Sequence, residues 1–114
     1  MKVMIVDDET DIRESLREAF EDEGYSVSTA TNGAEALERL KTEELPCAIV
    51  LDLIMPIVGG VEVYEQLQQD ARLARIPVII STSDPGRAPA GALIMKKPID
   101  LDRLIGTIQK HCKS

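Results

Sequence analysis

The chain has 114 residues, of which 44% are hydrophobic and 29% are charged, and its formal net charge is −7. This length fits one domain with a single core, and no apolar run approaches the roughly 20 residues that a membrane helix needs. The negative charge disfavours nucleic acid or an anionic membrane as a partner, because both attract basic surfaces. The stretch before Asp7 is too short for a signal peptide. We therefore expect one cytoplasmic domain over residues 1–114.

Only two cysteines occur, Cys47 and Cys112, and they lack the spacing of metal ligands. In the cytosol thiols are kept reduced, so a disulfide between them is not expected. Both are predicted to be small apolar core residues.

Short runs rich in β-branched residues alternate along the chain with stretches of helical period. The predicted strands are Lys2–Val6, Tyr25–Ala30, Cys47–Leu51, Pro77–Ser81 and Ala92–Met95. After the first strand, Ile12 and Leu16 lie on one apolar helix face. Asp8 or Thr10 is expected to cap this helix, and Gly24 to end it.

Three further segments follow the same alternation. Asn32 is expected to cap a second helix, and Val61 and Tyr64 lie on the apolar stripe of a third. Asp100 is expected to cap the last helix. Its apolar face would be formed by Leu101, Leu104, Ile105, Ile108 and Cys112.

The crossover between the last two strands differs from the others. Residues 82–91 contain two prolines and two glycines, so a regular helix is not expected there. A loop or a single turn should replace it. Elsewhere, strands alternating with helices predict a five-stranded, doubly wound parallel α/β sheet with helices on both faces. The apolar runs 48–51 and 78–80 fit strands that are buried on both sides.

Polar side chains follow four of the predicted strands, and the carboxyl ends of parallel strands meet at one edge of a sheet. Asp7 and Asp8 follow the first strand, Asp52 the third, Thr82 the fourth and Lys97 the fifth. A single aspartate at such a place is commonly only a helix cap or a turn residue. Four strand ends with complementary groups predict a site instead.

The chemistry of this set suits a phosphoryl group and Mg²⁺. Clustered carboxylates repel one another unless a cation is bound or a proton is taken up, and Mg²⁺ prefers such oxygen ligands. Lys97 could neutralise a phosphoryl group, and the Thr82 hydroxyl could donate a hydrogen bond to it. One of the three carboxylates would be left to accept the phosphoryl group.

Several segments in this order resemble the response-regulator receiver domains of two-component signalling, including chemotaxis-type regulators. The matching segments are 4–9, 24–25, 30–37, 51–56 with Gly60, 77–82, and 97–98. The resemblance covers essentially the whole chain. It implies a flavodoxin-like sheet in strand order 2-1-3-4-5, in which the family's fourth helix is shortened or missing here.

The resemblance also implies a role for each site residue. Asp52 would be the phosphoacceptor. Mg²⁺ would be bound by Asp8, by Asp52, by the backbone carbonyl of Ile54 and, through a water, by Asp7. Thr82 and Lys97 would hold the phosphoryl oxygens, and the Lys97–Pro98 peptide bond would be cis, a state that only X-Pro bonds tolerate readily.

The partners follow from the same resemblance. The phosphoryl donor would be a phosphohistidine on a sensor histidine kinase or a histidine phosphotransfer protein, and an unknown downstream protein would receive the signal. The chain would be a signalling domain that takes part in its own phosphorylation and dephosphorylation, and not an enzyme acting on other substrates.

The sequence departs from the receiver family at two places that take part in the family's phosphorylation-dependent conformational switch. In the family, Thr82 would act with an aromatic residue three positions before the lysine, but this position is Ile94, whose side chain is stiff at χ1. The segment 83–91 is also too short and too rich in proline and glycine for the usual helix. We favour a switch in which phosphorylation orders this loop. The alternative is an interaction module that works without phosphorylation.

Functions of two other classes fit the sequence less well. A haloacid-dehalogenase-like phosphatase would place its nucleophile after the first strand, at Asp7, but the chain lacks room for that family's larger core and cap. A flavodoxin-like cofactor binder needs a phosphate loop there. The four acids between Asp7 and Asp11 would repel a phosphate, and no glycine-rich phosphate-binding motif is present.

Overall fold

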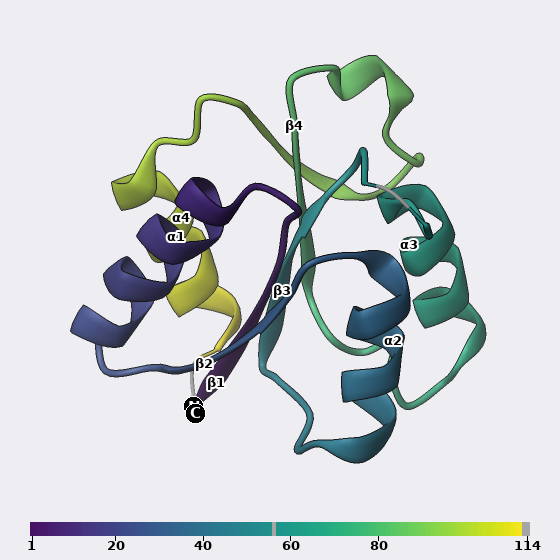
Figure 1. The fold of residues 1–114 in the computed structure, drawn as a ribbon, viewed down its shortest axis with the longest axis horizontal. Helices are drawn as coiled ribbons and strands as arrows, with labels where there is room; N and C mark the ends of the chain where they lie inside the picture. Colours follow the sequence, from purple (N-terminus) through teal and green to yellow (C-terminus); the bar gives the residue numbers. More distant parts are fainter. Residues whose placement is uncertain (56, 113–114) are drawn as a thin grey trace.

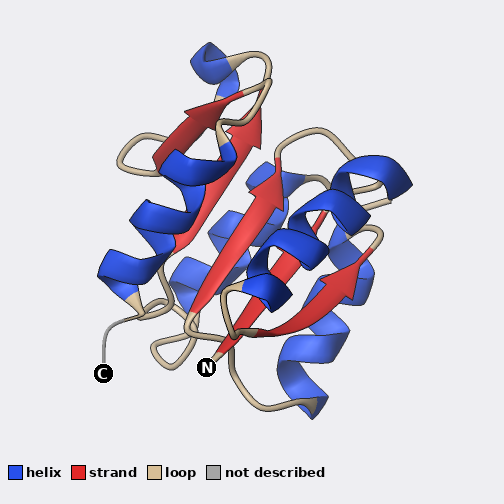
Figure 2. Ribbon diagram, turned by 90° about the vertical axis from the view of Figure 1, so that its left-hand side faces the viewer, coloured by secondary structure: helices blue, strands red, loops and turns tan. Residues whose placement is uncertain are grey.

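The computed structural model describes residues 1–55 and 57–112; Pro56, which belongs to one of the matching segments, lies outside them. Strands and helices alternate along the chain (Figures 1 and 2). In order they are β1 (Lys2–Val6), α1 (Thr10–Asp22), β2 (Ser26–Ala30), α2 (Gly33–Thr42), β3 (Ala48–Asp52), α3 (Gly60–Gln69), β4 (Val78–Thr82), the 3-10 turn η1 (Pro85–Arg87), β5 (Leu93–Lys96) and α4 (Leu101–His111).

The five strands form one parallel sheet in the order β2-β1-β3-β4-β5. Helices α1 and α4 lie on one face, and α2 and α3 lie on the other (Figure 1). The predicted fold class and strand order are therefore confirmed. Strands β3, β4 and β5 begin and end one residue later than predicted, so that Asp52 and Thr82 are the last residues of their strands.

The sheet separates two apolar clusters. One lies under α2 and α3 and includes Met4, Leu51, Val63 and Ile80. The other lies under α1 and α4 and includes Phe20, with Val3 and Val50 from the sheet and Leu104 and Ile108 from α4. All five residues of β3 are buried, as expected for a central strand with both faces covered.

The helix caps agree with the predictions at two helices and differ at one. The Asn32 side chain accepts from the backbone N–H of Glu35 at 2.9 Å, and the Asp100 side chain accepts from that of Arg103 at 3.2 Å. The prediction that Asp8 or Thr10 caps α1 is wrong. The cap residue is Glu9, without a side-chain bond, because Asp7 already closes the preceding turn by accepting from the Glu9 N–H at 2.9 Å.

The crossover between β4 and β5 is confirmed as a loop with one short turn, η1. No regular helix in the described part of the chain covers β5 on the side of α3. Ile94, which lies on that side of β5 beside Ile80, is consequently 39% exposed, whereas Leu93 lies on the opposite side of this edge strand and is 42% exposed. Met95, between Ile94 and the site lysine, points the other way into the cluster under α1 and α4.

The two cysteines differ from expectation. Both pack with the cluster under α1 and α4, as predicted, but they are joined in a disulfide with a Cα–Cα distance of 5.4 Å. The prediction that they do not pair is wrong because it rested on the cellular compartment. The fold brings the start of β3 to the end of α4, although the two residues are 65 positions apart in sequence.

Within residues 1–55 and 57–112, every helix is too short or too polar to cross a lipid bilayer.

Candidate functional site

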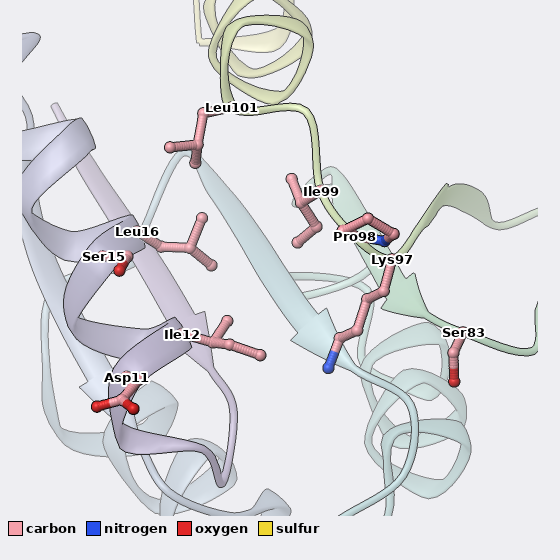
Figure 3. Close-up of a pocket in the computed structure, with 9 residues that line it drawn as sticks. All are labelled: Asp11, Ile12, Ser15, Leu16, Ser83, Lys97, Pro98, Ile99 and Leu101. Atoms are coloured by element: carbon pink, nitrogen blue, oxygen red, sulfur yellow. The ribbon is translucent and has the colours of Figure 1, made fainter.

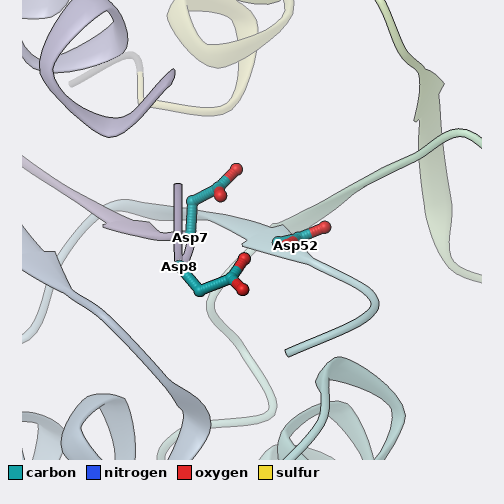
Figure 4. A group of neighbouring side chains, drawn as sticks. All are labelled: Asp7, Asp8 and Asp52. Carbon is teal, nitrogen blue, oxygen red and sulfur yellow. The ribbon is translucent and has the colours of Figure 1, made fainter. Parts of the chain in front are cut away.

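Three carboxylates meet at the carboxyl edge of the sheet (Figure 4). Asp7 directly follows β1, where its backbone N–H still donates to the carbonyl of Ala30 at 3.1 Å. Asp52 is the last residue of the neighbouring strand β3. One carboxylate oxygen from each of Asp7, Asp8 and Asp52 lies within 4.8 Å of the others. Asp7 and Asp52 are buried, and Asp8 is exposed. The structure thus brings together the three carboxylates that the sequence analysis selected.

Lys97 lies beside the two buried carboxylates. Its Nζ donates to Asp52 Oδ1 at 3.3 Å and lies 3.6 Å from Asp7 Oδ2. The backbone fixes this position, because the Lys97 N–H donates to the carbonyl of Thr82 at 2.9 Å and so extends the pairing of β5 with β4. The peptide bond between Lys97 and Pro98 is cis.

The site contains more negative than positive charge. The pKa of Asp52 is raised to about 6, mainly by burial and then by the nearby Asp7 carboxylate, and Lys97 offsets only part of these two effects. Burial also lowers the pKa of Lys97, but Asp52 and Asp7 outweigh that effect, and the pKa lies above its ordinary value. The lysine therefore stays charged while Asp52 is protonated unusually easily.

The residues present fit a divalent cation. Three carboxylates face a single ammonium group, so the pocket keeps excess negative charge even when Lys97 is counted. Oxygen ligands of this kind are those that Mg²⁺ prefers. Ile54, whose carbonyl was predicted to take part, lies two residues after Asp52 in the loop at the same edge, with its side chain 55% exposed.

The two remaining predicted residues lie on β4 and β5. Thr82 is buried, and its Oγ1 accepts from the backbone N–H of Asp84 at 3.0 Å. No hydrogen bond links its hydroxyl to the acidic group in the part of the chain that the structure describes. Ile94 is on the edge strand and half exposed, so it is not packed inward toward Thr82. The three carboxylates and Lys97 are therefore assembled, while Thr82 touches Lys97 only through its backbone carbonyl and Ile94 lies exposed on the edge strand.

Comparisons with known proteins agree with this geometry. The family described as "Response regulator receiver domain" matches residues 3–109. The chain belongs to this family. Its resemblance to receiver domains, predicted from the ordered motifs, is thereby confirmed.

Individual receiver domains and regulators show the same likeness. Response regulator MprA of Mycobacterium leprae is 35% identical over 114 residues, which cover 96% of this chain and 50% of that protein. The chain thus spans about half the length of this curated relative. The crystal structure of chemotaxis regulator CheY4 of Vibrio cholerae has a TM-score of 0.84 at 28% identity, covering 96% of this chain and 97% of that one. TrrA of Thermotoga maritima, in complex with Mg²⁺-BeF, has a TM-score of 0.84 at 29% identity, covering 96% and 97%.

An apolar cavity of about 590 Å³ adjoins the receiver site. It lies between α1 and the segment from Lys97 to Leu101, which leads into α4 (Figure 3). Ile12 and Leu16 from α1 face Ile99 and Leu101 across it. This cavity was not predictable from local sequence patterns, because its walls come from segments far apart in the chain.

Three further residues lie around the three carboxylates, and two of them belong to the segments that resemble receiver domains. The Arg13 guanidinium donates to the carbonyl of Asp7 at 2.9 Å and holds the turn after β1. Gly60 donates its N–H to the Leu53 carbonyl at 2.8 Å, where a Cβ would collide with the backbone of Asp52. The resemblance to receiver domains had picked out Gly60, and this close approach is the physical reason for a glycine there.

The third is Ser81, the partner of Asp52 in the pairing of β3 and β4. Its hydroxyl is buried and has no hydrogen-bond partner among the residues that the structure describes. Nothing in the local sequence distinguishes this serine from a surface one.

Proposed function

We propose that this receiver domain accepts a phosphoryl group on Asp52 from a phosphohistidine, and that the resulting change switches the binding of a downstream protein. The observation that carries the proposal is the buried Asp52 carboxylate, beside Asp7 and within 3.3 Å of the Lys97 ammonium. The complex of TrrA with Mg²⁺-BeF supports it, since that similar protein binds both Mg²⁺ and beryllium fluoride.

The transfer needs positioning and charge neutralisation more than covalent chemistry. An oxygen of the Asp52 carboxylate forms a bond to phosphorus as the phosphorus–nitrogen bond of the donor breaks, and the electron pair stays with the imidazole, which takes a proton from solvent. Lys97 and Thr82 are proposed to bind phosphoryl oxygens. Lys97 is already placed beside the acceptor, so this charge needs little rearrangement.

Mg²⁺ is proposed as the cofactor, held by Asp7, Asp8 and Asp52 and by the backbone carbonyl of Ile54. When bound, it supplies positive charge to the phosphoryl oxygens during transfer. We further propose that residues 1–114 form one domain located in the cytoplasm. It would act as a signalling domain, without catalysis on other substrates and without direct contact to nucleic acid or membrane.

The experiment that tests the acceptor is phosphotransfer to wild type and to Asp52→Asn, with and without Mg²⁺. Labelling should require Mg²⁺ and be absent in the Asn variant, because the amide cannot form the acyl phosphate. Labelling that persists unchanged in Asp52→Asn rejects the assignment. If mass spectrometry finds the modification on Asp7, the phosphatase hypothesis gains support. If the protein is not labelled but still binds its partner, it is an interaction module that works without phosphorylation.

The donor is proposed to be a sensor histidine kinase or a histidine phosphotransfer protein, and the cavity beside the site offers it an apolar contact. Leu101 lines this cavity and is 38% exposed, so Leu101→Glu places a charge there without disturbing the core. An acidic residue is also tolerated in the first turn of α4.

We expect this variant to reduce transfer from a protein donor about tenfold, the effect of about 1.4 kcal/mol of lost binding. Acetyl phosphate, which has no protein surface to dock, should label the variant as fast as wild type. Equal loss with both donors would mean that the substitution damages the site itself, and the docking proposal would then fail.

A further inference from the structure

The end of the sheet opposite the acidic site carries the disulfide between Cys47 and Cys112. Cys47 directly precedes β3, whose other end is Asp52, and Cys112 caps the end of α4. The bridge therefore joins a central strand to the last helix, at the edge of the domain away from the carboxylates.

Backbone hydrogen bonds set the position of each cysteine within its own element. The N–H of Cys47 donates to the carbonyl of Lys2 at 2.7 Å, and the N–H of Cys112 donates to that of Ile108 at 2.8 Å. Both side chains also pack with the apolar cluster under α1 and α4. Because both pack on the same cluster, we expect the two cysteines to stay close after reduction, so the bond can form again although the end of α4 has lost its covalent attachment.

α4 packs on the sheet with Ile105 beside its buried row, and Gln109 donates to Glu23 at 3.4 Å near its end. Its contact with the sheet is made by one row of buried residues, Leu104, Ile108 and Cys112, while Leu101 and the polar face are exposed to solvent. The bridge lies at the end of that row. It adds a covalent attachment where a helix would otherwise fray.

We propose that Cys47 and Cys112 are a redox modification site, whose disulfide locks the end of α4 to the start of β3. Oxidation proceeds by exchange with a low-molecular-weight disulfide. The two protein thiols lose two electrons and two protons to form the sulfur–sulfur bond, and the small disulfide takes up both to become two thiols. A dithiol reverses the reaction. In a compartment kept reducing by thiols, disulfides are typically transient or redox-sensing, so the pair would close only under oxidising conditions.

The direct test uses the whole chain equilibrated with oxidised glutathione or with dithiothreitol, followed by thiol alkylation under denaturing conditions and mass measurement. We expect no alkylated cysteine in the first case and two in the second, with full recovery of the bridge when the reductant is exchanged for the oxidant. Two thiols that react under both conditions would overturn the proposal.

The structural consequence is tested by amide hydrogen exchange. On reduction, exchange in the last turn of α4 (107–111) should become at least about tenfold faster, because that turn loses its covalent attachment. The melting temperature should fall by on the order of 10 °C, since the bridge closes a long loop. Identical exchange in the two redox states would show that the bond locks nothing.

Cys47→Ser is the matched control, because it keeps the buried Cys112 in place and removes only the bond. Its exchange in α4 should match that of the reduced wild type and should not respond to either reagent. Labelling of Asp52 by acetyl phosphate should persist in both redox states, because the bridge lies at the other end of β3. A fault in the proposed phosphoacceptor would abolish that labelling without changing the redox response.

Discussion

At the scale of the single residue, Ile57 has the least expected conformation. It follows the acceptor strand in the loop to α3, with a φ of 70°, and its side chain is 79% exposed. A β-branched side chain crowds the backbone in this left-handed region. Because the side chain is exposed to water, packing does not offset the energetic cost of this conformation. The position is therefore strained without a compensating contact in the folded domain.

Replacing this residue should stabilise the domain. We expect Ile57→Asn to raise the free energy of unfolding by about 1 kcal/mol, because asparagine tolerates positive φ much better than isoleucine. Urea unfolding without Mg²⁺ measures the change. Ile54→Asn is the matched control, since Ile54 is an exposed isoleucine of the same loop with no positive φ. An equal gain in both variants would point to reduced exposed apolar surface instead of relieved strain.

At the scale of the element, the crossover from β4 to β5 is the least regular part of the fold. It contains only the turn η1, with Ala88 and Ala92 packed against the core, and leaves Ile94 of β5 exposed. Few buried contacts hold such a segment, and segments of this kind are the ones that switch most readily. It starts one residue after Thr82, which we propose to bind the phosphoryl group.

We therefore expect residues 83–95 to respond when the site is loaded. Beryllium fluoride with Mg²⁺ should shift the backbone amide resonances of this segment and reduce its mobility, as measured by nuclear magnetic resonance relaxation. The same addition to Asp52→Asn should leave the spectrum unchanged. If wild type binds beryllium fluoride at the site and residues 83–95 do not respond, the loop is not the switch.

At the scale of the whole molecule, the Asp52 carboxylate lowers the stability of the domain at pH values at which it is charged. Its pKa is about 6 in the folded chain, against 3.8 ordinarily. Between these two values the folded state binds more protons than the unfolded state, so the contribution of Asp52 to stability falls as pH rises through this window and stays low above about pH 6.

Removing the charge should reverse this loss. We expect Asp52→Asn to be more stable than wild type at pH 7.5 without Mg²⁺, by about 1 to 2 kcal/mol once the lost contact with Lys97 is counted, and the difference should shrink toward pH 4. Chemical unfolding across this pH range measures it. Asp8→Asn, at the exposed carboxylate, should show a much smaller change. A wild type that is as stable as Asp52→Asn at every pH would contradict the raised pKa.

Local patterns in the sequence determined most of the fold and the membership of the site. Asn32 and Asp100 cap their helices because a cap depends on residues three positions apart, and the apolar runs predicted buried parallel strands because each needs only its own composition. Asp7, Asp8, Asp52 and Lys97 could be grouped because parallel strands end at one edge. The prolines and glycines between β4 and β5 also correctly predicted that this crossover has no regular helix.

Only the tertiary structure decided what depends on distances through space. The pairing of Cys47 with Cys112, the cavity between α1 and the start of α4, and the burial of the Ser81 hydroxyl each arise from segments that are remote in the chain. The raised pKa of Asp52 likewise depends on how deeply it is buried and on which charges surround it. Periodicity and composition describe neighbours along the chain, whereas burial and contact describe neighbours in space, and these features belong to the second kind.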